Sequence, residues 1–187
     1  MKRLTAVLVV GVALLWASTA FAQYSALEDA PAYGPWIGVG GLVISGDNGV
    51  GDSDSAFLGT VTIAGMVDYL TWQAFYGMDF EEATAWGGSV DYVLASNFDE
   101  CFTCPEEGMW WFGAGGTLVD VSDLYYDEND STAALSDTYF GPNIGVGYVW
   151  EDWLLTFYVH YLFGDESDSL AFQGNVMYNF TNYRLPN

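Results

Sequence analysis

The chain contains one histidine, His160, in the segment 158–162. A histidine paired with a serine is the chemistry of acyl-transferring enzymes, including enzymes that modify lipids. No serine occurs at strand spacing around His160, and the nearest serines downstream belong to the next loop. We therefore predict no catalytic residue. A hydrogen-bonded interior histidine, paired with the carboxylate of Asp91, is the favoured interpretation.

Two cysteines, Cys101 and Cys104, form a Cys-x-x-Cys sequence in a long connecting segment. This spacing occurs in redox-active sites and in halves of metal sites. The chain offers no second cysteine pair, no nearby histidine and no βαβ pattern around these residues. A short structural disulfide formed in an oxidising compartment is therefore favoured, and no cofactor is predicted.

Acidic residues gather between the apolar segments, most densely at Asp127, Glu128 and Asp130. Carboxylate oxygens are hard ligands that suit Ca²⁺, so these three residues are candidate calcium ligands and divalent cations are candidate partners. They do not fit the twelve-residue pattern of an EF-hand loop. A solvated, mutually repulsive surface that keeps the loops soluble is favoured over a metal site.

The first 22 residues have the three parts of a secretory signal peptide. Lys2 and Arg3 form a charged start, an apolar run follows to Trp16, and an Ala-x-Ala sequence ends at Ala22. A membrane-anchoring helix is the alternative, but the small-residue exit and the proline-containing segment that follows favour cleavage. We predict a signal peptide over 1–22, a periplasmic lead-in over 23–35 and a single domain thereafter.

Charge and composition exclude two classes of protein. After cleavage, Arg184 is the only Lys or Arg against 25 Asp and Glu, a formal charge of 1 − 25 = −24. Such a chain repels nucleic acid, which is therefore excluded as a partner. Although 51% of the residues are hydrophobic and 18% aromatic, no later stretch approaches 18 consecutive apolar residues. A helical membrane protein is thereby excluded as well.

Apolar and polar residues instead alternate with period two, the pattern of strands that face two different environments. Eight such runs follow one another between residues 36 and 180, separated by turn-like segments. Runs of about ten residues fit tilted strands that cross a hydrocarbon core. The predicted fold is all-β, an eight-stranded antiparallel up-and-down transmembrane β-barrel over 36–180, followed by a C-terminal extension over 181–187.

The connections predict which rim of the barrel faces which compartment. Loops after the first, third, fifth and seventh runs are strongly acidic, whereas two of the three intervening turns are very short. The loop after the fifth run is predicted to hold Asp123, Asp127, Glu128, Asp130 and Asp137. With both chain ends in the periplasm, the acidic loops face outside. Trp, Tyr and Phe should then form two interfacial rings. The predicted periplasmic ring is Trp36, Tyr69, Trp72, Tyr92, Trp110, Trp150, Trp153, Tyr178 and Phe180, and the opposite ring is Phe57, Phe80, Trp86, Phe140, Phe163 and Phe172.

This pattern resembles the small Gram-negative outer-membrane barrels of the OmpA, OmpX and OmpW type, over essentially the whole mature chain. The resemblance implies an integral position in the outer membrane, in contact with its lipid and lipopolysaccharide. It also implies that the outer-membrane assembly machinery recognises the aromatic end of the last strand. Tyr178 and Phe180 occupy the positions of that assembly signal.

Function is predicted less sharply than location. Eight strands leave an interior just wide enough for side chains, and the large inward residues Phe75, Trp111, Tyr139 and Tyr158 would fill it. We therefore expect a non-enzymatic barrel with a structural or surface-interaction role in the cell envelope. A narrow channel for small solutes and a lipid-modifying enzyme are alternatives. A further alternative is a soluble lipocalin-like barrel, which would turn its apolar face inward around a ligand.

Overall fold

The computed structural model describes residues 32–47, 53–79, 83–97, 108–125, 134–164 and 168–180. The predicted signal peptide, both cysteines of the predicted disulfide (Cys101 and Cys104) and the three candidate calcium ligands (Asp127, Glu128 and Asp130) lie outside these ranges. Within the described ranges, no helix is long and apolar enough to cross a membrane.

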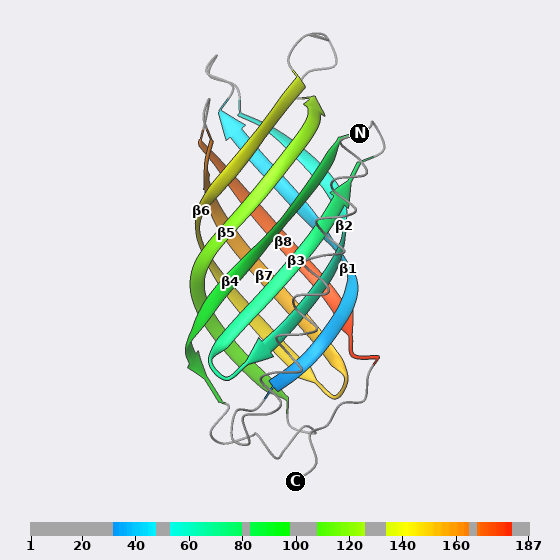
Figure 1. Ribbon diagram of the computed structural model, residues 1–187, viewed down its shortest axis with the longest axis vertical. Coiled ribbons are helices and arrows are strands. Elements are labelled where there is room, and N and C mark those ends of the chain that lie inside the picture. Colours follow the sequence, from blue (N-terminus) through cyan, green and yellow to red (C-terminus); the bar gives the residue numbers. More distant parts are fainter. Residues whose placement is uncertain are drawn as a thin grey trace.

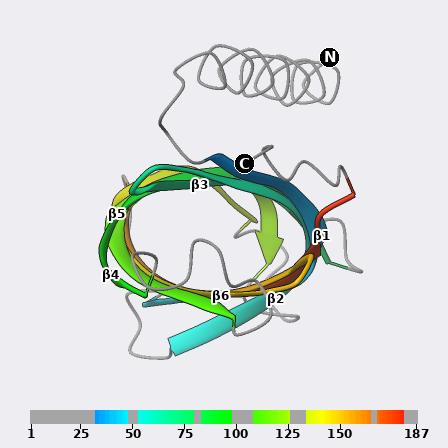
Figure 2. The same ribbon diagram turned by 90° about the horizontal axis from the view of Figure 1, so that it is seen from below.

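Eight antiparallel strands form a closed barrel in sequence order, with the last strand paired to the first (Figure 1). Viewed along the barrel axis, the wall closes into a ring (Figure 2). The predicted fold class is therefore confirmed. The strands are β1 (Ala32–Asp47), β2 (Ser53–Val67), β3 (Leu70–Met78), β4 (Thr84–Ser96), β5 (Met109–Tyr125), β6 (Ala134–Trp150), β7 (Trp153–Phe163) and β8 (Asp168–Tyr178).

The connections fall into two groups at opposite ends of the barrel. We call the end where β1, β3, β5 and β7 finish the loop side, and the other end the turn side (Figure 1). Two turn-side connections are two-residue turns that begin with a non-glycine residue at positive φ, Asp68 (55°) and Glu151 (54°). The backbone N–H of Val93 donates to the carbonyl of Tyr69 at 2.8 Å, which fastens one of these turns to the neighbouring strand.

Strand β1 differs from its predicted form. It begins at Ala32, four residues before the first predicted strand residue, Trp36. Between Tyr33 and Trp36 the pairing with β2 shifts by one residue, because two residues of β1 oppose one of β2. A bulge of this kind reverses the faces of the side chains beyond it. Beyond the bulge the register is continuous, and the even-numbered residues Trp36, Leu42 and Ile44 point into the barrel. Trp36 is 2% exposed, so its predicted place in the outer aromatic ring is wrong.

The strands also extend further toward the loop side than the alternating pattern indicated. Asp123 and Asp137 were predicted in the acidic loop, but they lie within β5 and β6. The β5–β6 ladder continues as far as the pair Tyr125 and Ala134. Backbone pairing does not require an apolar face, so it continues past the point where alternation of apolar residues ends.

Candidate functional site

The side chains inside the barrel form three layers along its axis. Each layer is built from alternate residues of the strands, because successive side chains point to opposite faces. Two apolar layers lie at the ends and a polar layer lies between them. The buried polar side chains are Thr60, Thr62, Thr71, Gln73, Ser89, Asp91, Thr117, Asn143, Thr156, His160, Ser169, Gln173 and Asn175.

Asp91 is the carboxylate of the polar layer and is 0% exposed. Its Oδ1 accepts a hydrogen bond from the side-chain amide of Asn143 on β6. Its Oδ2 accepts one from the hydroxyl of Ser89, two residues earlier on β4, at 3.2 Å. Gly115 stands between Asp91 and Asn143 in the ladder, and a Cβ there would lie 2.7 Å from Asp91 Oδ1. The missing side chain of Gly115 therefore leaves room for Asn143 to reach the carboxylate.

A second network joins strands that are far apart in the sequence. Gln73 on β3 donates from Nε2 to Oε1 of Gln173 on β8 at 3.1 Å. Asn175 accepts from the Thr62 hydroxyl at 2.9 Å and donates to the Thr156 hydroxyl at 3.0 Å. Polar atoms in a low-dielectric interior must be paired or they cost free energy, so these bonds hold the middle of the barrel together across its lumen.

The apolar layers cover the polar layer on both sides. On the turn side, Trp111 and Tyr158 pack with ring centroids 6.0 Å apart. The turn-side layer is Trp36, Ala64, Met66, Val93, Met109, Trp111, Val149, Leu154, Tyr158 and Met177. The loop-side layer is Leu42, Ile44, Leu58, Phe75, Ala83, Ala85, Val119, Val121, Tyr139, Leu162 and Ala171. The large residues predicted to fill the lumen, Phe75, Trp111, Tyr139 and Tyr158, are at most 4% exposed. The described lumen is thus closed by two apolar layers.

His160 faces the lumen as its position in the sequence indicated. Its ring stacks on Tyr158 at a centroid distance of 5.7 Å and an angle of 16°. In the ladder it pairs with Asn143, so Asn143 stands between His160 and Asp91. Neither imidazole nitrogen has a hydrogen-bond partner among the described residues. The structure brings the predicted pair of His160 and Asp91 into one layer, but it does not join them by a hydrogen bond.

The outer face of the barrel is apolar, in contrast to the polar middle layer of its interior. Many large hydrophobic side chains are exposed there, from Phe57 at 62% and Phe140 at 63% on the loop side to Trp150 at 51% on the turn side. Of the predicted turn-side ring, Tyr69, Tyr92, Trp110, Trp150, Trp153 and Phe180 are exposed. The wall thus separates an apolar exterior from a mixed and closed interior.

The predicted assembly signal lies at the turn-side end of β8. Tyr178 contacts Trp153 edge-on at 4.9 Å and Phe180 edge-on at 5.1 Å. Its hydroxyl donates to Asp152 Oδ2 at 3.3 Å, and the backbone N–H of Asn179 donates to the Asp152 carbonyl at 2.8 Å. Phe180 is 70% exposed. These contacts hold one exposed aromatic ring beside the rim.

Packing and hydrogen bonds hold the described side chains of the lumen in place. In the described lumen, Ser89 donates to Asp91. Ser169 was predicted in a loop but lies buried in β8, and neither its hydroxyl nor the imidazole of His160 has a hydrogen-bond partner among the described residues. No group of three or more His, Cys, Asp or Glu residues in the described ranges could hold a metal ion. The hydrogen-bonding roles of Asn143, Gln73 and Gln173 were not predicted from the sequence. Their inward positions in the alternating pattern were visible, but their partners were not.

Together these features define a closed eight-stranded β-barrel with an apolar outer belt. No protein-family model matches the chain, and no curated protein matches it. Among solved structures, it is similar to neisserial surface protein A (NspA), with a TM-score of 0.49 and 16% identity over 80% of this chain and 99% of that one.

Two further structures are similar to the chain. One is the attachment invasion locus protein Ail of Yersinia pestis, with a TM-score of 0.35 and 12% identity over 78% of this chain and 97% of that one. The other is the N-terminal β-barrel domain of Pseudomonas aeruginosa OprF, with a TM-score of 0.41 and 14% identity over 75% of this chain and 96% of that one. The neighbours are small outer-membrane barrels, the kind that the strand pattern resembles. At these identities the likeness concerns the fold alone.

Proposed function

We propose that the chain is an integral outer-membrane β-barrel, non-enzymatic, with a structural or surface-interaction role in the cell envelope. The observation that carries this proposal is the outer belt, in which 27 large hydrophobic side chains of the described residues are exposed around a buried polar layer. Water would make such a surface unfavourable, whereas the hydrocarbon of a bilayer covers it at no cost. The distribution also opposes a lipocalin-like barrel, whose exterior is polar.

The closed lumen supports a structural role over transport. A solute that crossed the barrel would have to displace both apolar layers, including Trp111 on the turn side and Tyr139 on the loop side. Each is 2% exposed and close-packed, so passage would require repacking of both layers. The functional surface would then be the outer belt and the two rims.

The proposed partners follow from this position. Outer-membrane lipid and lipopolysaccharide would surround the belt, and the assembly machinery would recognise the end of β8 at Tyr178 and Phe180. The exposure of Phe180 and its contact with Tyr178 support that recognition, because an exposed aromatic ring is available to a partner. Divalent cations at the acidic loops remain a candidate partner.

Cell fractionation with a heat-modification assay tests the location. We expect the protein in the outer-membrane fraction, with a folded form that migrates differently in SDS gels before and after boiling. Recovery in the soluble periplasmic fraction, or a single migration in both conditions, would contradict the proposal.

Planar-bilayer recording of purified, heat-modifiable protein separates the structural role from the channel. We expect no discrete openings, because two apolar layers close the described lumen. Openings of reproducible size in the wild-type protein would contradict the structural role and favour a channel.

A further inference from the structure

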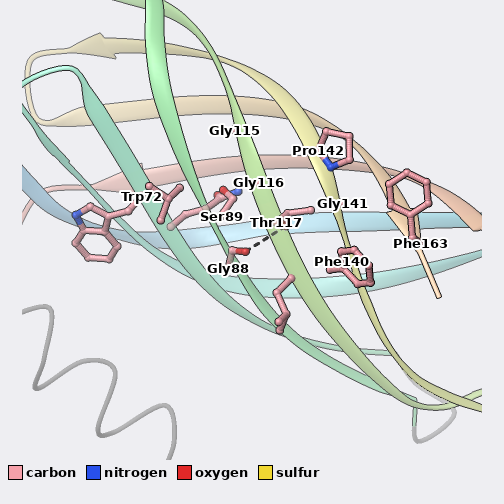
Figure 3. Close-up of a pocket in the computed structure, with 13 residues that line it drawn as sticks. Trp72, Gly88, Ser89, Gly115, Gly116, Thr117, Phe140, Gly141, Pro142 and Phe163 are labelled. Atoms are coloured by element: carbon pink, nitrogen blue, oxygen red, sulfur yellow. Dashed lines mark hydrogen bonds between the residues drawn. The ribbon is translucent and has the colours of Figure 1, made fainter. Parts of the chain in front are cut away.

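An open groove of about 810 Å³ crosses the outer face of the barrel wall from β3 to β7 (Figure 3). Its walls are the outward-facing side chains Trp72, Val90, Leu118, Phe140 and Phe163. The Phe140 and Phe163 rings contact each other with centroids 5.9 Å apart. The groove is thus a depression in the apolar belt with aromatic residues at both ends.

Two outward-facing glycines make the floor of the groove. Gly88 on β4 pairs with Leu118 on β5, and Gly116 on β5 pairs with Val90 and Pro142 on its two neighbours. A Cβ at Gly116 would meet no atom closer than 4.0 Å, so the space above this residue is open. A Cβ at Gly88 would lie 2.8 Å from the carbonyl oxygen of Gln73. The wall is therefore open above Gly116, whereas the close approach of β3 leaves no room for a side chain at Gly88.

The strand pairing beside the groove is also interrupted. The β6–β7 ladder passes from the pair Phe140 and Phe163 directly to the pair Asn143 and His160. Pro142, which lies between them, has no N–H to donate, and proline is unfavourable within a paired strand. A Cβ at Gly141 would lie 1.7 Å from the Tyr161 carbonyl oxygen, so glycine is required there. The pairing of β6 with β7 is therefore interrupted at Gly141 and Pro142, which line the groove.

Most of the groove lies in the loop-side half of the apolar belt, and only its β3 end reaches Trp72 near the turn side. On β5 the outward-facing residues run from Trp110 at the turn side to Leu118, and the next one, Asp120, is polar and bonded to the Thr138 hydroxyl at 2.7 Å. Gly116 and Leu118 are the last two positions before this polar edge. If the belt is embedded as proposed above, the groove faces the hydrocarbon of the loop-side leaflet.

We propose that the groove binds one acyl chain of a lipid in the loop-side leaflet, an inference that rests on the proposed membrane location. The lining favours hydrocarbon because the side chains of its walls are apolar. The carbonyl oxygen of Gly88 in the floor already accepts a hydrogen bond from the Thr117 hydroxyl at 3.1 Å, so it does not need a polar ligand. Four strand spacings give the groove a length of about 19 Å, enough for an extended chain. Its thirteen lining residues are fewer than the roughly 20–30 per side of a stable protein interface, which disfavours a second barrel.

Native mass spectrometry of the barrel released from nanodiscs of dimyristoyl phosphatidylcholine tests the site. Gly116→Leu fills the groove without strain, and we expect it to lose one retained lipid per barrel relative to wild type. Gly174→Leu is the matched control, because Gly174 also faces outward and a Cβ there would meet nothing closer than 4.0 Å. We expect this control to retain lipid as the wild type does.

Equal retention by wild type and both variants, all in the folded heat-modifiable form, would overturn the groove and leave the membrane location intact. A wild-type dimer that Gly116→Leu abolishes would assign the groove to a second copy and also overturn the proposal. Phosphatidylcholine with a photoreactive acyl chain, confined to one leaflet of oriented proteoliposomes, identifies the source of the chain. We expect adducts at Leu118 and Phe140 from the loop-side leaflet, and adducts from the opposite leaflet alone would contradict it.

Discussion

The two faces of the barrel wall reverse the usual arrangement of a soluble protein. Outside, large side chains such as Phe57 and Phe140 are more than 60% exposed. Inside, Asp91, His160 and Gln173 are 0% exposed in the middle layer. Each strand contributes to both faces, because its side chains alternate between them.

The two faces of the wall therefore place different physical requirements on their residues. The outer face needs only to be apolar at the right height, so many residues of similar hydrophobicity are acceptable at each position. The inner face has to fill a fixed volume and pair its polar groups, so the identity of each residue matters. The effect of a substitution on the free energy of unfolding should therefore depend on shape and hydrogen-bond partner at the inner face, and mainly on polarity at the outer face.

Trp111→Ala should give the largest loss of stability, because it removes a 2% exposed ring that packs on Tyr158 in the turn-side layer. Truncation of a buried Trp costs about 3–5 kcal/mol in the free energy of unfolding. The control is Trp110→Ala on the same strand, whose ring is 45% exposed on the outer face. Guanidinium unfolding of both variants in lipid vesicles measures the difference. Equal losses would mean that the two faces do not differ in packing.

Ile144→Arg should give the second-largest loss of stability, and it tests whether the outer face lies in lipid. Ile144 is 49% exposed in the middle of the outward face of β6. An arginine near the bilayer midplane costs about 2–4 kcal/mol, whereas an arginine on a surface exposed to water usually costs less than about 0.5 kcal/mol. Ser55→Arg, at an exposed position near the loop side of β2, is the control in the same unfolding assay. A negligible effect of Ile144→Arg would contradict the placement of the outer face in lipid.

The alternating pattern was sufficient to predict the strand number, the closed topology and the face of most residues. It could not predict the face of Trp36, because the first run is rich in glycine and has apolar residues at both even and odd positions, which leaves the phase of the alternation ambiguous. It also placed Asp123 and Asp137 in a loop, since backbone pairing in β5 and β6 continues after the apolar alternation stops.

The contacts within the lumen could not be predicted from the pattern at all. Gln73 and Gln173 are bonded to each other although 100 positions separate them in the sequence. Such a contact depends on the stagger of the strands around the closed barrel, which period-two alternation does not encode. For the same reason, the sequence placed His160 and Asp91 in one interior but missed Asn143 between them.

Asn143→Leu tests the pairing rule of the inner face. The variant removes the amide that donates to Asp91 and keeps a side chain of similar size. Loss of a hydrogen bond to a charged group costs about 1.5–3 kcal/mol, so we expect a destabilisation of that order. The double variant Asp91→Leu with Asn143→Leu should be less destabilised than Asn143→Leu alone, because it leaves no buried carboxylate that has lost its amide donor. Additive losses in the unfolding assay would show that the two side chains act independently.

His160→Phe should have the smallest effect, within about 1 kcal/mol of wild type or slightly stabilising. Two buried nitrogens without partners are removed, each unpaired polar group costing about 1–3 kcal/mol, and the replacement ring keeps the stacking on Tyr158. This gain is offset by the slightly larger ring in a filled lumen. Gln173→Leu is the control, because it removes a paired group that is also 0% exposed, and it should cost about 0.5–1.5 kcal/mol. A greater loss for His160→Phe than for Gln173→Leu would mean that the imidazole has a bound partner, and the inner face would then hold a functional group as well as a packed core.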